Sequence, residues 1–280
     1  MKAYEILVDQ IIEKLEQWII PWNKPWVWWV PSNYISNKSY RWFNKLVLSL
    51  NDFNDNRYLT AKQIKELWAS IKKWSKWTKI YYFKINQLDE TESNSKKEIY
   101  NIPMIKYYTV FNVEQTEWLN LKVNETVNKD TIKLYKAQEI VTNYKDKPLI
   151  KNWLNASYNL SDDIITMPSL YKFKNNEEYF STLFHELVHS TWSQNRLSRF
   201  WLKEFEYYWS DNYSKEELVA ELGSMFLCME AWIQNTTLDN SKNYIAWRLK
   251  YIKWNKKDLI YASMQADKAI SYIKNDNNIA

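Results

Sequence analysis

The chain has one glycine in 280 residues, where average composition would supply about twenty. Glycine is the only residue that adopts positive φ without a steric penalty. A folded chain that lacks it must build its turns and helix ends from other residues. The single cysteine, Cys228, excludes an intramolecular disulfide, which is typical of proteins from reducing compartments. No apolar run reaches the roughly 18 residues that a membrane-spanning helix requires.

Acidic residues interrupt the apolar N-terminal stretch, so this stretch does not match a secretory signal. We therefore expect a cytoplasmic protein without membrane contact. The hydrophobic content of 46% is sufficient for a substantial core. Nothing in the composition indicates an oligomeric state.

Tryptophan, by contrast, occurs seventeen times, often where glycine is usually found. Trp74 and Trp77 lie among Lys, Ser and Thr, and Trp209 and Trp254 have similarly polar neighbours. Such segments form turns, where an indole fits poorly. One interpretation is an aromatic surface for a flat partner. The interpretation that we favour is that these tryptophans represent UGA codons, which some bacterial lineages decode as glycine.

The patterning predicts an α+β chain of two domains, residues 1–125 and 150–280, joined by a polar linker over residues 126–149. The first domain is small, and the second is mainly helical with a short sheet. Helices are expected over residues 2–19, 43–50, 61–70, 133–144, 176–191, 214–231, 242–253 and 257–274. Strands are expected over residues 79–85 and 105–113, with a short pair around 156–167.

Both histidines of the chain lie in one motif, His185-Glu186-Leu187-Val188-His189. On a helix, this spacing puts both imidazoles on one face, where they can chelate one Zn²⁺. Glu186 would then act as a general base toward water at the metal. A chance match on a core helix is the alternative. The use of every histidine at ligand spacing favours the metal site.

A zinc site of this kind needs a third ligand. A third histidine in the metzincin pattern is excluded because that position is Asn195. Glu217 and Glu221 lie four residues apart on a predicted helix, which suits Glu217 as ligand and Glu221 as the carboxylate that orients a histidine N–H. Glu216 is the alternative ligand, and a solvated acidic helix face is the alternative to any site. Three further side chains could assist an oxyanion, namely Tyr213, Arg196 and Arg199.

Several segments together resemble the ArdC-type antirestriction proteins of plasmids and other mobile elements. They are residues 21–26, 39–44, 58–60, 72–78, 108–116, 185–189 and 216–223. The resemblance covers nearly the whole chain. It implies an N-terminal domain that binds single-stranded DNA and a C-terminal zincin-like metallopeptidase domain.

Single-stranded DNA binding combines a basic groove with aromatic stacking platforms. Trp22 and Trp26 would stack on bases, with Lys24, Tyr40 and Arg41 beside them. The lysines of the most basic stretch would contact phosphates, namely Lys72, Lys73, Lys76 and Lys79. A solvated basic face, and a structural role for the two tryptophans, are the alternatives.

In this family, glycine stands at nine positions where this chain has tryptophan: 18, 42, 68, 74, 77, 118, 192, 209 and 232. Trp22 and Trp26 instead match family tryptophans. We therefore expect several of the nine to be exposed or at positive φ.

The expected role is protection of incoming single-stranded DNA from restriction, with Zn²⁺ as cofactor and a protein as a further possible substrate. Two alternatives remain open. One is a DNA-binding shield whose metal is purely structural. The other is a peptidase that cleaves a specific regulatory protein.

Overall fold

The computed structural model describes residues 8–9, 11–13, 30–89, 99–119, 129–199, 211–233, 252–253 and 255–276. Trp22, Lys24 and Trp26 lie outside the described residues, as does most of the predicted helix over 242–253. Of the predicted first helix, the described residues are helical. In the described part of the chain, no helix is long and apolar enough to cross a membrane.

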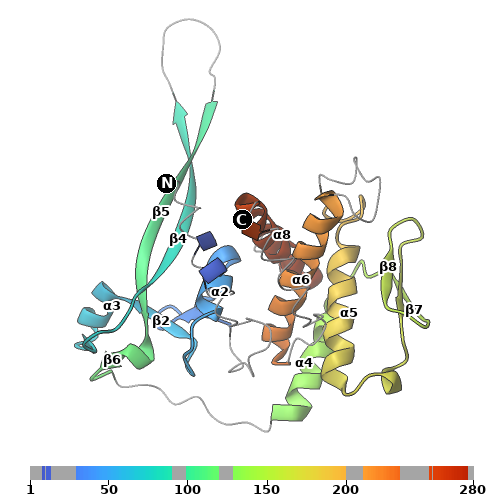
Figure 1. The fold of residues 1–280 in the computed structure, drawn as a ribbon, viewed down its shortest axis with the longest axis horizontal. Coiled ribbons are helices and arrows are strands. Elements are labelled where there is room, and N and C mark those ends of the chain that lie inside the picture. Colours follow the sequence, from blue (N-terminus) through green and yellow to red (C-terminus); the bar gives the residue numbers. More distant parts are fainter. Residues whose placement is uncertain are drawn as a thin grey trace, which may run out of the picture.

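The N-terminal domain is built on a four-stranded sheet in the order β1-β2-β5-β4 (Figure 1). Its strands are β1 (Ser32–Asn33), β2 (Arg57–Thr60), β4 (Thr78–Asp89) and β5 (Ile99–Asn112). Strand β1 pairs with β2 in parallel, and the other pairs are antiparallel. Strands β4 and β5 continue past the rest of the sheet as a long two-stranded ribbon.

Short elements complete this domain: α2 (Trp42–Ser49), α3 (Ala61–Glu66), β3 (Ser70–Ile71), the 3-10 helix η2 (Val113–Gln115) and β6 (Thr116–Glu117). Helix α3 begins where the sequence predicts, because the Thr60 side chain accepts a hydrogen bond from the Gln63 backbone N–H. The Gln63 side chain in turn accepts from the N–H of Thr60. Asn112 and Gln115 form the same reciprocal box at the start of η2.

The C-terminal domain packs helices against a three-stranded sheet in the order β7-β9-β8. The strands are β7 (Leu149–Asn152), β8 (Ser157–Asn159) and β9 (Ile164–Met167), followed by η3 (Leu170–Lys172). The helices are α4 (Lys129–Asn143), α5 (Asn176–Ser190), α6 (Asp211–Ala231) and α8 (Lys256–Ile273). The α+β fold of two domains is confirmed, with one strand more in the second sheet than predicted.

The predicted linker over residues 126–149 differs from the structure. Most of it forms α4, and Ala137, Ile140 and Val141 of this helix lie in the main core beside α6 and α8. This core also includes Phe43, Leu46 and other apolar residues of α2, so the two domains share it. Helix α4 therefore belongs structurally to the second domain.

The only glycine of the chain, Gly223, lies on α6 where this helix crosses α5. A Cβ atom at this position would come within 2.7 Å of Cγ2 and 2.8 Å of Cγ1 of Val188. Val188 itself is fully buried. Glycine is thus required for the close approach of the two helices, rather than for an unusual backbone conformation.

We expect Gly223→Ala to lower the free energy of unfolding by about 1–3 kcal/mol, as overpacking typically does. Urea denaturation would measure the change. Adding Val188→Ala removes the methyl groups that the new Cβ would meet, so the double variant should lose less stability than the sum of the two single variants. If the stability losses of the two single variants simply added up in the double variant, this explanation of the helix crossing would be wrong.

Candidate metal centre and nucleic-acid surface

Helix α5 carries both histidines on the face that it turns toward α6. Asn175 caps the start of the helix, because its side chain accepts a hydrogen bond from the Glu178 backbone N–H at 2.8 Å. Glu177 and Glu178 in the first turn complement the helix dipole. One turn separates His185 from His189, and their Nε2 atoms lie 3.0 Å apart.

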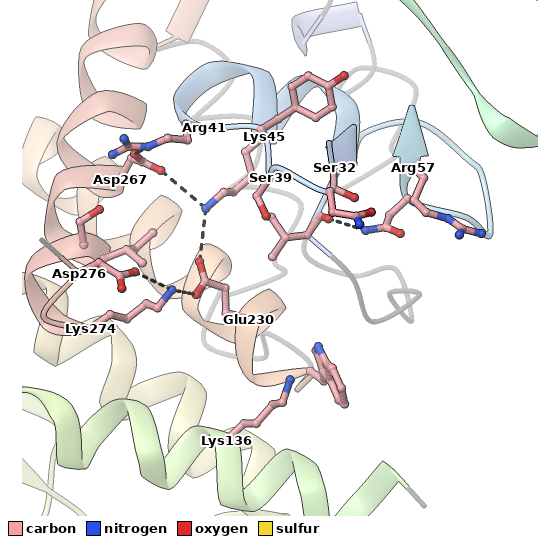
Figure 2. Close-up of a pocket in the computed structure, with 17 residues that line it drawn as sticks. Ser32, Ser39, Arg41, Lys45, Arg57, Lys136, Glu230, Asp267, Lys274 and Asp276 are labelled. Atoms are coloured by element: carbon pink, nitrogen blue, oxygen red, sulfur yellow. Dashed lines mark hydrogen bonds and ion pairs between the residues drawn. The ribbon is translucent and has the colours of Figure 1, made fainter. Parts of the chain in front are cut away.

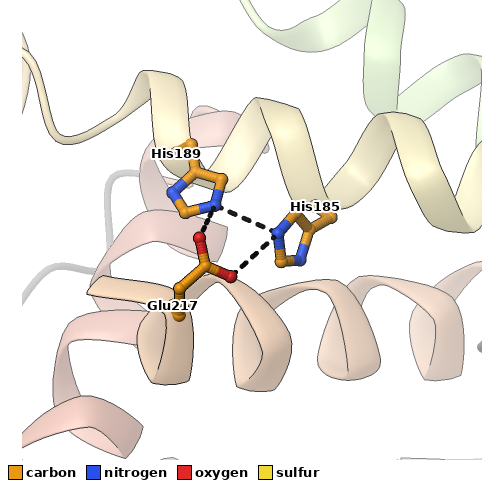
Figure 3. Close-up of side chains that lie close together, drawn as sticks. All are labelled: His185, His189 and Glu217. Carbon is orange, nitrogen blue, oxygen red and sulfur yellow. Dashed lines mark hydrogen bonds and ion pairs between the residues drawn. The ribbon is translucent and has the colours of Figure 1, made fainter. Parts of the chain in front are cut away.

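Glu217 on α6 completes a three-residue cluster with these histidines (Figure 3). Its Oε2 lies 3.6 Å from Nε2 of His185, and its Oε1 lies 3.4 Å from Nε2 of His189. All three candidate ligand atoms lie within 4.8 Å of one another. The structure therefore brings together His185, His189 and Glu217, and it does so from two helices.

This donor set fits a divalent metal ion. Two nitrogens bound to one tetrahedral Zn²⁺ at 2.0–2.1 Å would lie roughly 3.3 Å apart, close to the spacings seen here. Two imidazoles and one carboxylate also form the ligand set of catalytic zinc sites that keep a position open for water.

A buried ion pair between Glu216 and Arg199 lies next to the cluster and contacts it through His189. Glu216 is completely buried and accepts hydrogen bonds from Nε of Arg199, at 2.8 Å, and from its Nη2. Oε1 of Glu216 lies 3.5 Å from Nδ1 of His189. Arg199 also donates to Oγ1 of Thr191 at 2.7 Å and to the Val188 carbonyl at 3.1 Å. This pair therefore joins the end of α5 to α6 and orients the His189 ring.

The charges of the cluster shift its pKa values in opposite directions. Burial disfavours ionisation of Glu216, but Arg199 and His189 outweigh it and hold the pKa of Glu216 below its usual value. Burial is likewise outweighed at Glu217, where His189 and His185 lower the pKa of the carboxyl. The pKa of His189 lies well above its usual value, because Glu217 and Glu216 overcome the effect of burial. Without a cation the site thus concentrates negative charge around the imidazoles.

The other predicted site residues have different surroundings. Glu186 is buried on α5 between the two histidines. Glu221 is buried one turn beyond Glu217, and its role in orienting a histidine stays a prediction, since the carboxylate near His189 Nδ1 is that of Glu216. Nδ1 of His185 is buried without a hydrogen-bond partner among the described residues.

Neither candidate arginine is available to an oxyanion. Arg199 is enclosed by Glu216 and the end of α5. Arg196 forms a bidentate pair with Asp163 at 2.7 and 2.8 Å and also donates to Oγ of Ser193 at 2.8 Å. The Tyr213 side chain lies outside what the structure describes.

Tyr40 and Arg41, predicted to contact DNA, line a cavity of about 620 Å³ at the junction of the two domains (Figure 2). Nε of Arg41 lies 2.9 Å from Oδ2 of Asp267 on α8. Nζ of the buried Lys45 lies 3.6 Å from carboxylate oxygens of both Asp267 and Glu230. Arg41 thus joins α2 to the second domain, a contact that the sequence did not reveal.

The four predicted lysines lie on or beside the segment between β3 and β4. Lys72, Lys73 and Lys76 are exposed, and Lys79 is half-buried. The backbone N–H and Nζ of Lys72 donate to the carbonyls of Gln115 and Glu114, each at 2.8 Å. This segment is therefore held against η2 while its other lysines face solvent.

Sequence reasoning missed an aromatic surface on the β4–β5 ribbon. Tyr82, Tyr107 and Tyr108 are all about half exposed or more. Tyr82 pairs with Lys106 across the strands, and Ile80 pairs with Tyr108, so Tyr82, Lys106 and Tyr108 share one face. On the opposite face, Nζ of Lys79 lies 5.3 Å from the Tyr107 ring centroid. Clusters of aromatic residues next to lysines in both strands, such as Lys106-Tyr107-Tyr108, were the available signal.

Comparison with known proteins finds a different family in each half of the chain. Residues 1–111 match the model of the N-terminal domain of anti-restriction factor ArdC, and residues 135–265 match that of a zincin-like metallopeptidase. Two proteins of Escherichia coli, each named DNA primase TraC, are 26% identical over 96% of this chain. The chain spans only 20% and 27% of the length of these two relatives.

Solved structures extend the similarity to the whole fold. The metal-free structure of the antirestriction protein ArdC from plasmid R388 has a TM-score of 0.76 at 27% identity, over 98% of this chain and 97% of that one. Its Mn(II)-bound structure has a TM-score of 0.77 at 27% identity, over the full length of both chains. The chain therefore has an N-terminal domain of the ArdC family followed by a domain of the zincin-like metallopeptidase family, in the fold of the antirestriction protein ArdC.

Proposed function

We propose that this protein binds single-stranded DNA through its N-terminal domain and holds Zn²⁺ at His185, His189 and Glu217 in its C-terminal domain. The convergence of these three side chains is the observation that supports the metal site most strongly. We further propose that the protein acts in the cytoplasm, where it shields incoming single-stranded DNA from restriction.

A zinc ion in this site would polarise a substrate carbonyl and lower the pKa of water. The charge of Glu186 acts on His189, and we infer that its carboxylate would take the proton of the water that attacks an amide. Glu216 and Arg199 would hold His189 in place during this step. A protein is accordingly the substrate class that we propose for this site.

The β4–β5 ribbon supports the DNA-binding half of the proposal. Sequence-independent binding of a single strand needs exposed rings for the bases and cations for the phosphates. Tyr82 and Tyr108 offer such rings on one face, with Lys106 between them. Lys73 and Lys76 add exposed cations near the base of the ribbon. Two relatives also bear the name DNA primase.

We expect Tyr82→Ala and Tyr108→Ala each to weaken binding of an oligothymidine single strand, since loss of one stacked base costs about 1–3 kcal/mol. Filter binding at low salt would measure the dissociation constants. The wild-type affinity should fall steeply as salt is added.

Tyr135→Ala on α4 and Tyr171→Ala on η3 are the matched controls, because both tyrosines are exposed in the other domain. They should leave the affinity unchanged. A wild-type protein with no affinity for single strands at low salt would refute the DNA-binding proposal. Equal losses in the ribbon and control variants would refute the assignment of the surface.

A further inference from the structure

Five tryptophans of this protein have a backbone conformation that normally requires glycine. Their φ angles are 54° at Trp42, 59° at Trp68, 69° at Trp74, 65° at Trp118 and 62° at Trp232. Positive φ is uncommon outside glycine, and where other residues adopt it they are usually Asn or Asp. Only eight tryptophans have a described backbone, so this conformation is the rule among them rather than the exception.

Two of the five occupy the position after a helix at which glycine is the standard residue. After α3, the Trp68 N–H donates to the Lys65 carbonyl and the Ala69 N–H donates to the Ile64 carbonyl. After α6, the Trp232 N–H donates to Met229 and the N–H of Ile233 donates to Cys228. These bonds define the Schellman motif, whose left-handed residue is usually glycine and sometimes asparagine.

Helix α8 provides an internal comparison for this motif. Its end has the same hydrogen bonds, from Asn275 to Tyr272 and from Asp276 to Ser271, and the left-handed residue there is Asn275 at φ 57°. The chain thus places a residue suited to positive φ at one such end and tryptophan at the other two.

Trp74 has the corresponding position in a tight turn. The Ser75 N–H donates to the Lys72 carbonyl, which makes Trp74 the third residue of a four-residue turn. Positive φ at the third residue is typical of the type II turn, where glycine is favoured.

Packing does not compensate for this strain at the exposed positions. Trp68 is 93% exposed, Trp74 is 87% exposed and Trp118 is 84% exposed. An indole with so little contact contributes almost nothing to the core. Tryptophan therefore has a steric cost at these positions and no corresponding gain in buried apolar surface.

We propose that glycine occupies positions 42, 68, 74, 118 and 232 in the native protein, because the cell of origin decodes the UGA codons there as glycine. The shortage of glycine and the excess of tryptophan then have one cause. This proposal does not depend on whether the protein binds DNA.

Glycine at two of these positions would change charged surfaces. Nζ of Lys73 lies 5.2 Å from the Trp74 ring centroid, and Nζ of Lys136 lies 3.2 Å from the Trp232 ring centroid. Trp232 and Lys136 both line the cavity between the domains (Figure 2). With glycine, the Lys72–Ser75 turn would expose backbone N–H groups among lysines, and the cavity would gain the space of an indole.

Peptide mass spectrometry on the protein from its native cells tests the proposal directly. Peptides covering the five positions should have the mass of glycine, whereas Trp22 and Trp26 should have the mass of tryptophan. The gene should correspondingly have UGA at the five positions and UGG at positions 22 and 26. Tryptophan masses at positions 68, 74 and 118 would overturn the proposal.

A substitution series in recombinant protein tests the conformational argument by itself. Trp68→Gly, Trp74→Gly and Trp118→Gly should each raise the melting temperature by about 2–4 °C, the shift expected for relief of roughly 1 kcal/mol in a domain of this size. Trp68→Asn should give part of the same gain. The control is Trp153→Gly, because Trp153 is 65% exposed but is not among the residues with positive φ. An equal or larger gain at position 153 would overturn the argument.

Discussion

Alanine in place of His189 is expected to abolish tight binding of a divalent metal ion. Nε2 of His189 lies within 3.4 Å of both other candidate ligand atoms, so its loss leaves only one imidazole and one carboxylate. Replacement of residues that merely support a ligand already costs about 10–100-fold in metal affinity, and loss of a ligand should exceed that. Metal analysis after dialysis should find about one ion per wild-type chain and almost none in the variant.

Glu186→Gln is the control for this experiment. The predicted base keeps its volume but loses its charge, and it is not one of the three clustered ligands. This variant should therefore retain the metal. If it also retains antirestriction, the ion serves structure alone and the DNA-binding shield is the better description. Metal binding that survives in the alanine variant would show that His189 is not a ligand.

Loss of the Arg199 guanidinium is expected to destabilise the protein by about 3–5 kcal/mol, the usual cost of removing one partner of a buried ion pair. In Arg199→Met the Glu216 carboxylate would remain completely buried without its principal cationic partner. The Thr191 hydroxyl and the Val188 carbonyl would lose hydrogen bonds as well. Urea denaturation of the metal-free protein would measure the loss without a contribution from metal binding.

The double variant Arg199→Met with Glu216→Leu distinguishes the stability lost through the unpaired charge from stability lost in the rest of the core. Replacing both partners by apolar residues of similar size is often nearly neutral, so much of the lost stability should return. Metal affinity should nevertheless stay reduced, because His189 has lost the carboxylate near its Nδ1. A loss below about 1 kcal/mol in Arg199→Met would contradict the role assigned to this pair.

The sequence predicts the two histidines as neighbours because four residues on one helix determine their geometry. The sequence does not determine in the same way which of Glu216, Glu217 and Glu221 is the third metal ligand. Adjacent helical residues point about 100° apart, and tertiary packing decides which of them faces α5. The close approach of Gly223 to Val188 is part of that packing, and a contact between two helices cannot be read from either helix alone.

Contacts between residues far apart in the sequence account for most of the other differences between the predictions and the structure. The polar stretch after residue 85 suggests a loop, yet β4 continues to Asp89 because each residue pairs with one on β5. The contact of Arg41 with DNA stays a prediction, and the sequence gives no sign of its ion pair with Asp267, which lies 226 positions further along the chain. The segment that forms α4 suggests a linker because it is largely polar, yet its Ala137, Ile140 and Val141 are buried, and the helix packs against α5, α6 and α8.

The junction around Lys45 has a consequence for how the two modules can be inherited. Lys45, Glu230 and Asp267 bring charges from both domains together beside a core that both domains share. Separated from each other, the modules would expose this apolar surface and leave buried charges without partners. A recombination event that exchanged one module would therefore need a compatible partner surface on the other. The junction thus favours the transfer of both modules as one unit, even where they form only part of a longer protein.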